Sequence, residues 1–411
     1  MQYTDELIRA LPKTDLHCHL DGSLRLNTLI DLARSRGVQL PSETPEGLRE
    51  LVFKDTYRDL PDYLHGFAYT CAVLTDGEAL EQIAYELGRD CLAEGVYYLE
   101  VRFAPQLHVR KDFSVADVLM AVTRGLDKVR REHEATPSVV SGHEPPFRFG
   151  LICCAMRMFT GGFGPWYRDL LNVLSHWPVK QVYGAASLSL VRSVVDARDR
   201  LGLPVVGFDL AGAEAGHPAS DHVDAYRFAL RNFLRRTVHA GEAYGPESIF
   251  QGITLLHADR LGHGTSLFSA DQVRSRVDDP HQYVRRLSEY IADRRILIEV
   301  CVTSNLQTMP HLRRVEDHPL GRMIQDRISV SLCTDNRLVS LTTVSNEVRK
   351  VVDAFDLSPP ELQRLLMHGF KRSFFPGSYK EKRSYVRKVI DYYNRVAAEH
   401  GVPLVSRGSL V

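Results

Sequence analysis

The feature that most constrains the fold is a regular alternation of short apolar segments with stretches of helical patterning. Eight segments rich in β-branched or aliphatic residues recur along the chain: TDLHCHL, GVYYLEVRFAP, FRFGLICCAM, PVVGFDLAG, RTVHAGE, DRLGHG, ILIEVCVTSN and ISVSLCTDN. Such alternation is typical of parallel strands joined by crossover helices. Eight strand-helix repeats close a (β/α)8 barrel of the TIM type, which is the α/β fold that we predict. A doubly wound open sheet is the alternative.

Three stretches exceed the minimum repeat: one after the first strand, one after the third strand, and the loop EATPSVVSGHEPP before the third strand, which we expect at the surface. We also expect additional helices after the first strand and at the C-terminus. After the first strand, Leu60, Tyr63, Leu64 and Phe67 recur at helical spacing, which fits either core packing or an apolar lid over a pocket. After the third strand, a long insertion beginning FTGGFGPWY could shape specificity, form an interface or do neither. We expect one barrel domain over residues 1–411.

The charge balance disfavours several classes of partner. The 51 lysines and arginines equal the 51 aspartates and glutamates, so no net field attracts a nucleic acid or an anionic membrane. The N-terminal stretch MQYTDELIRALPKTD contains no apolar run suited to a signal peptide, and we predict a cytoplasmic protein. The seven cysteines, mostly in apolar runs, are predicted to be reduced core residues. The sequence predicts no oligomeric state.

Polar residues gather at the carboxyl ends of the predicted strands, where the loops of a (β/α)8 barrel build the active site. In chain order they are His17, His19 and Asp21; Asp209 and Gly212; His239 and Glu242; His263; Ser304 and Asn305; and Asp335 and Asn336.

A metal site is the simplest use of these side chains. His17 and His19 are two residues apart and therefore face the same side of a strand. With His239 and Asp335 they form a nitrogen-rich set with one hard oxygen ligand, which suits Zn²⁺ with an open position for water. Zinc can lower the pKa of a water molecule from about 15.7 to about 7, so hydrolytic chemistry follows.

Glu242 and His263 are candidates for proton transfer and water positioning, and each has a plainer alternative. Glu242 could be a charge at the start of a helix. His263, flanked by glycines in LGHG, could be a buried structural histidine.

The motifs LHCHLDGS, DLAG, VHAGE, LGHG, EVCVTSN and SLCTDN stand in the order and approximate spacing of the adenosine deaminases. The chain resembles this family, within the metal-dependent amidohydrolase superfamily, from about residue 10 to 375. Each motif alone is modest, but the ordered set is very specific.

The resemblance implies hydrolytic deamination of adenosine, and of deoxyadenosine, to the inosine product and ammonia. It implies one Zn²⁺ per chain, bound by His17, His19, His239 and Asp335. Glu242 would protonate purine N1, His263 would orient the attacking water, and Asp335 could also accept the proton of that water. The implied substrate contacts are a ribose hydroxyl for Asp21, purine N3 for the backbone N–H of Gly212, purine N7 for Asn336, and an apolar wall of Leu60, Tyr63, Phe67 and Met156.

The sequence departs from the family pattern at two positions. Asn336 stands where most known relatives have a second aspartate, although its amide can donate to N7 at any pH. Ala213 stands where many relatives have an acidic residue. Because of these changes and the long insertion, the substrate could instead be aminodeoxyfutalosine, another 5′-modified adenosine or adenine. Asp21 in HLDG favours a nucleoside over free adenine.

Two alternatives come from other classes: a zinc hydrolase acting on a phosphoester or amide, and a non-catalytic ligand-binding relative. The H-x-E and P-C-x-x-C signature of zinc nucleobase deaminases does not occur, so we expect a small nucleoside substrate and water as partners, with neither nucleic acid nor membrane.

Overall fold

The computed structural model describes residues 3–309 and 311–403. Its strands are β1 (Lys13–His19), β2 (Val96–Phe103), β3 (Arg148–Met156), β4 (Val205–Ala211), β5 (Arg235–Arg236), β6 (His239–Ala240), β7 (Arg260–His263), β8 (Leu297–Val300) and β9 (Val330–Leu332). All neighbouring pairs are parallel, in the orders β1-β2-β3-β4-β5 and β6-β7-β8-β9. The eight predicted strand segments are therefore confirmed, with β5 and β6 as two halves of the fifth.

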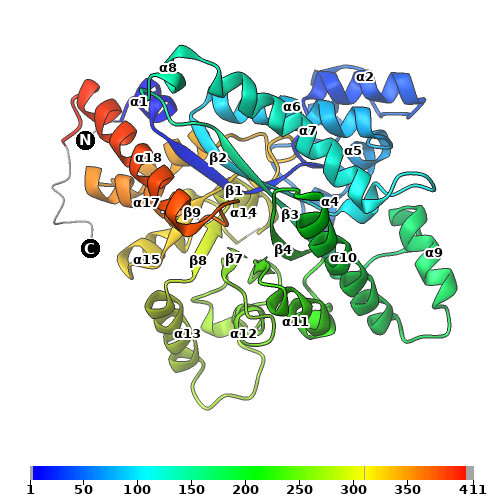
Figure 1. Cartoon of the computed structure of the whole chain (residues 1–411). Helices are drawn as coiled ribbons and strands as arrows, with labels where there is room; N and C mark the ends of the chain where they lie inside the picture. Colours follow the sequence, from blue (N-terminus) through cyan, green and yellow to red (C-terminus); the bar gives the residue numbers. More distant parts are fainter. Residues whose placement is uncertain (1–2, 310, 404–411) are drawn as a thin grey trace.

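Backbone hydrogen bonds connect the two groups of strands into a barrel (Figure 1). Between β5 and β6, Thr237 N–H donates to Phe208 O at 2.9 Å, which keeps the chain beside β4. At the other junction, Asp335 N–H donates to His17 O and His19 N–H donates to Asp335 O, both at 2.7 Å. This closure confirms the (β/α)8 prediction, and the doubly wound alternative is wrong.

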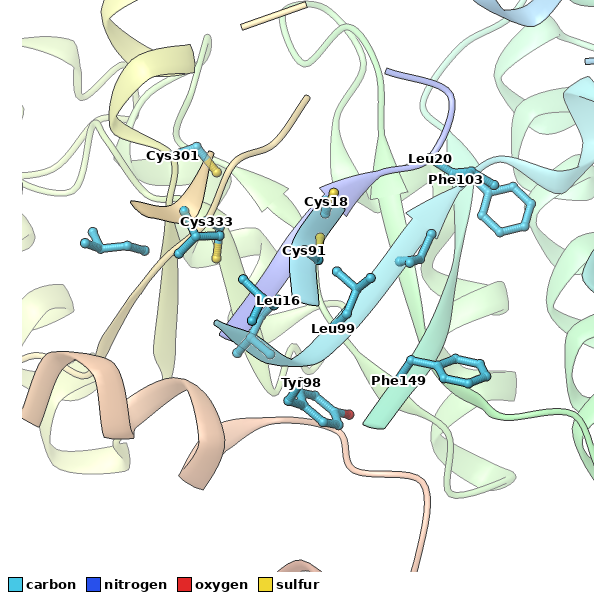
Figure 2. Packing of buried hydrophobic residues seen from close by; sticks show 14 of the residues in the cluster. Leu16, Cys18, Leu20, Cys91, Tyr98, Leu99, Phe103, Phe149, Cys301 and Cys333 are labelled. Carbon is cyan, nitrogen blue, oxygen red and sulfur yellow. The ribbon is translucent and has the colours of Figure 1, made fainter. Parts of the chain in front are cut away.

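The strands are buried on both faces, as expected where helices cover a parallel sheet. Every residue of β1 and of β2 is buried. Figure 2 shows Leu16 and Cys18 of β1 beside Leu99 of β2, with Cys333 near the neighbouring strand β9. All seven cysteines are free and six are buried, which confirms their predicted core positions for all but Cys71.

The helices surround the barrel (Figure 1). They are α1 (Asp5–Ala10), α2 (Leu26–Arg36), α3 (Pro45–Leu51), α4 (Leu60–Leu64), α5 (Phe67–Val73), α6 (Gly77–Ala93), α7 (Val115–Glu134), α8 (Pro137–Val140), α9 (Pro165–Val173), α10 (Val179–Leu201), α11 (Val223–Arg231), α12 (Pro246–Thr254), α13 (Pro280–Arg294), α14 (Val302–Thr308), α15 (Leu320–Gln325), α16 (Val344–Phe355), α17 (Pro359–Arg372) and α18 (Tyr379–Glu399). Among the described helices, none has both the length and the apolar character needed to cross a bilayer.

The predicted additional helices are present at both places. Helices α2 to α5 follow β1, and the helical spacing over residues 60–67 belongs to two short helices, α4 and α5, which break at His65–Gly66. At the C-terminus, α18 packs on the outside of the barrel, where Tyr385 Oη donates to Tyr97 O at 2.8 Å. The insertion after β3 forms a short 3₁₀ turn, η2 (Gly161–Phe163), and then α9.

Candidate metal and catalytic site

The four predicted ligands converge at the carboxyl ends of the strands. Ligand atoms of His17, His19, His239 and Asp335 all lie within 4.8 Å of one another, and all four residues are buried. His239 Nε2 is 3.0 Å from His17 Nε2 and 3.1 Å from His19 Nε2. Asp335 Oδ1 lies 3.4 and 3.5 Å from the same two atoms of His17 and His19. β1, β6 and the segment that follows β9 bring these residues together.

The chemistry of this cluster fits a cation. His17 Nδ1 is 3.0 Å from Glu299 Oε2, and His239 Nδ1 is 3.0 Å from Asp209 Oδ2. A carboxylate beside Nδ1 favours the proton on that nitrogen, so both Nε2 atoms present bare lone pairs to each other. Such lone pairs repel at 3.0 Å unless a cation lies between them. Zinc ligands at about 2.0–2.1 Å in a tetrahedral site are separated by roughly 3.3 Å, which agrees with the observed spacing.

The carboxylates behind the histidines belong to a buried ionic network that the sequence analysis largely missed. Arg102 donates to Asp209 Oδ2 at 3.0 Å and to Glu299 Oε2 at 2.6 Å, and Arg260 donates to Glu299 Oε1 at 2.7 Å. Burial alone would raise the pKa of Glu299, but the two guanidinium groups hold that pKa well below its usual range. The carboxylates therefore stay ionised and can orient His17 and His239.

Glu242 lies beside His263 in the cavity rather than at the start of a helix, since α12 begins only at Pro246. Its Oε2 is 3.7 Å from His263 Nε2, and its Oε1 is 3.5 Å from Thr308 Oγ1. Burial raises the pKa of Glu242 to about 7, and the charge of Asp335 acts in the same direction. A carboxyl group with this pKa is partly protonated at neutral pH and can donate a proton.

Glu214 holds the loop that carries Glu242, and the sequence analysis missed it. This buried carboxylate accepts hydrogen bonds from the backbone N–H groups of Gly241 at 2.8 Å, Glu242 at 3.0 Å and Ala243 at 2.6 Å. It also accepts a hydrogen bond from the Ser248 hydroxyl. Glu214 comes directly after Ala213 in DLAGAE, so the loop after β4 fixes the backbone of the loop after β6.

A chain of hydrogen bonds determines which nitrogen of His263 carries the proton. Leu320 N–H donates to His318 Nδ1 at 3.0 Å, so the proton of His318 is on Nε2, which donates to Asn305 Oδ1 at 3.2 Å. Asn305 Nδ2 then donates to His263 Nδ1 at 3.0 Å. Burial lowers the pKa of His263 to about 4 and that of His318 to about 3, so both rings are neutral at pH 7. His263 therefore presents an Nε2–H donor toward Glu242.

Ser304 and Asn305 were predicted at the end of the seventh strand, and this placement is wrong by a few residues. β8 ends at Val300, and both residues lie in the first turns of α14. Their side chains still reach the site, since Ser304 Oγ donates to Asp335 Oδ2 at 2.6 Å. The apolar run ILIEVCV ends at Val302, the first residue of α14, so the sequence pattern did not mark the boundary between strand and helix.

The backbone at the site takes conformations that most residues avoid. His263 and Asp335 have φ values of 63° and 61°, in the left-handed region. Glycines allow close approach nearby: a Cβ atom at Gly22 would lie 1.9 Å from Asn336 Oδ1, and one at Gly262 would lie 2.9 Å from His17 Cε1. Such strain is common where a fold positions functional groups.

The metal cluster opens into a cavity of about 680 Å³, within the range of small-molecule sites. Every predicted substrate contact lines it: Asp21, Leu60, Tyr63, Phe67, Met156, Gly212 and Asn336. The structure thus places the segment over residues 60–67 on the cavity wall, as the lid interpretation expected, and also against the hydrophobic core, as the packing interpretation expected. Tyr63 is not purely apolar there, because its hydroxyl accepts a hydrogen bond from Asn336 Nδ2 at 2.8 Å.

Comparison with known proteins agrees with this geometry. The sequence model of the family described as adenosine deaminase matches residues 12–160 and 183–392. The chain is 36% identical over 376 residues to a protein named adenosine deaminase from Mycobacterium leprae, which covers 90% of this chain and 92% of the relative.

Solved structures share the fold. An amidohydrolase with bound Zn from Burkholderia ambifaria aligns with a TM-score of 0.76 at 20% identity, over 98% of this chain and 96% of that one. The Arabidopsis protein ADAL, solved with IMP, aligns with a TM-score of 0.70 at 25% identity, over 96% and 99%. With the family match, the relative's identity and the shared fold, the chain belongs to the adenosine deaminase family.

Proposed function

We propose that this protein hydrolyses adenosine, and deoxyadenosine, to the inosine product and ammonia, with one Zn²⁺ held by His17, His19, His239 and Asp335. The observation that carries the proposal is the placement of Glu242 and the Nε2–H of His263 beside this ligand cluster in one cavity. When bound, the zinc ion supplies Lewis-acid activation of a water molecule.

Glu242 is the proposed general acid. Carbon 6 of adenine is a poor electrophile until the neighbouring ring nitrogen N1 is protonated. The carboxyl group of Glu242, whose pKa burial raises to about 7, can supply this proton at neutral pH. Glu214 supports the role by fixing the backbone of the loop on which Glu242 lies.

His263 and Asp335 are proposed to position and deprotonate the attacking water. The neutral ring of His263 offers its Nε2–H as a donor, which can stabilise negative charge that develops on the water oxygen. Asp335 would accept a proton from the water. Its other oxygen, Oδ2, accepts a hydrogen bond from Ser304, so the carboxylate is held in one orientation.

The remaining cavity residues are proposed to orient the nucleoside. Asp21 would hold a ribose hydroxyl, Gly212 would donate its backbone N–H to purine N3, and Asn336 would donate its amide to purine N7. Leu60, Tyr63, Phe67 and Met156 would form the walls around the ring system.

A second candidate is a purine nucleotide substrate, since the structure of ADAL at 25% identity was solved with IMP. A panel of adenosine, deoxyadenosine, adenine and AMP distinguishes the candidates, with ammonia release as the readout. We expect zinc-loaded protein to release ammonia from adenosine and deoxyadenosine. If the zinc-loaded protein released ammonia from none of the four compounds, deamination of these aminopurines would be refuted.

A further inference from the structure

One wall of the cavity lies outside the family pattern. The family match stops at residue 160 and resumes at 183, which leaves out η2 and all of α9. Gly162, Phe163 and Gly164 of this unmatched segment line the cavity. The insertion therefore forms a part of the cavity wall that lies outside the segments matched by the family model.

Arg110 lies next to this segment. Its Nη1 donates to the carbonyl oxygens of Leu107 at 3.0 Å and Val109 at 2.9 Å. A Cβ atom at Gly164 would lie 3.4 Å from the same Leu107 oxygen. Leu107, Arg110 and Gly164 all line the cavity, so the guanidinium and the insertion meet at one part of its wall.

The charge of Arg110 has no counterion in the structure. Among the described residues that line the cavity, Arg110 is the one lysine or arginine. It is half-buried, and no ion pair joins it to any carboxylate of residues 3–309 and 311–403. Its Nε and Nη2 donate to none of these residues either. A half-buried guanidinium with free donors is suited to an anion that accepts two parallel hydrogen bonds, such as a carboxylate or a phosphate.

Arg110 lies on the side of the cavity proposed to hold the ribose. Asp21 follows β1 and Arg110 follows β2, and these two strands pair side by side, with Leu20 N–H donating to Arg102 O at 2.9 Å. Both residues line the same cavity. A nucleoside whose ribose contacts Asp21 would direct its 5′ end toward this region.

We propose that Arg110 and the adjacent insertion form a subsite for an anionic 5′ substituent, a phosphate or a carboxylate, on an aminopurine nucleoside. This inference rests on the proposed function, since it presumes a nucleoside with its ribose at Asp21. It extends the substrates from adenosine to its 5′-anionic derivatives.

The test is calorimetric binding of inosine, IMP and inosine 5′-carboxylate to the full, zinc-loaded chain. The variants are Arg110→Gln, Arg110→Lys and, as the matched control, the exposed neighbour Lys111→Gln. We expect wild type and Lys111→Gln to bind at least one anionic ligand about tenfold more tightly than inosine, as a charge-assisted contact predicts. Arg110→Gln should abolish this ratio and Arg110→Lys should restore part of it.

Equal affinity of wild type for all three ligands would overturn the proposal, as would a ratio that Arg110→Gln leaves unchanged. If only IMP binds more tightly than inosine, the subsite is specific for phosphate. If both anionic ligands bind more tightly than inosine, the subsite accepts a phosphate or a carboxylate. Failure of the proposed function gives a different result: inosine would not bind, or no aminopurine would release ammonia, whatever residue 110 is.

Discussion

Replacement of Glu242 by glutamine removes the acidic proton and keeps the size and shape of the side chain. Glu242 is outside the four-residue ligand cluster, so the variant should bind zinc as wild type does. Its contacts with Thr308 and His263 are long, at 3.5 and 3.7 Å, so little stability should be lost. Any large loss of turnover then reports on proton donation.

The expected loss is large. General acid catalysis contributes about 10²- to 10⁴-fold to a rate, and we expect kcat of Glu242→Gln to fall by this factor, about 3–5 kcal/mol in activation free energy. The pH dependence has a definite sign, because the protonated carboxyl is the active form and its pKa is about 7. In wild type, activity should fall as pH rises above 7, and roughly one hundredth of the carboxyl remains protonated at pH 9.

The assay is steady-state ammonia release from adenosine between pH 5 and about 9, with zinc content measured on the same samples. Glu289→Gln is the control, since this glutamate of α13 is exposed and does not line the cavity. Near-normal turnover by zinc-containing Glu242→Gln would refute the reasoning. So would a wild-type profile with no decline above pH 7.

Three further substitutions test the surroundings of the site. Glu214→Gln should lower kcat about tenfold or more with zinc content unchanged, because an amide cannot accept every N–H of the loop as the carboxylate does; an unchanged kcat contradicts this positioning role. Asn305→Asp should shift the proton of His263 to Nδ1 and lower kcat about 10- to 100-fold. ¹⁵N NMR of the ring reports the tautomer directly, and an unchanged tautomer would contradict the role of this hydrogen-bond chain. Gly22→Ala should displace Asn336, since its Cβ would lie 1.9 Å from Oδ1, and we expect a loss of about 1–3 kcal/mol in unfolding free energy with a raised KM; thermal unfolding and kinetics like those of wild type would show that the site tolerates the methyl group.

The sequence predicted the barrel and the ligand cluster because both follow from short-range patterns. Alternating strands and helices repeat along the chain, and each strand ends in its own polar residue, so barrel geometry alone brings His17, His239 and Asp335 together. DRLGHG would be interpreted as a loop by itself, but its position in the repeat predicted a strand. The structure confirms this strand as β7.

The residues that the sequence missed act through partners distant in the chain. Glu299 lies within an apolar strand and looks like an isolated charge, yet it orients His17 across 282 positions of sequence. His318 lies in an irregular segment after α14, and its link to His263 through Asn305 depends on the path of two loops. No periodic pattern encodes such pairs, because side-chain hydrogen bonding is specified only by the folded geometry.

The central claim is hydrolysis of adenosine at carbon 6, and it is tested most directly by mass spectrometry of the product formed in ¹⁸O-labelled water. Zinc-loaded protein should convert adenosine to inosine that carries one ¹⁸O atom and should release one ammonia for each inosine. Unlabelled product, or no conversion by protein whose zinc content is confirmed, would contradict the account.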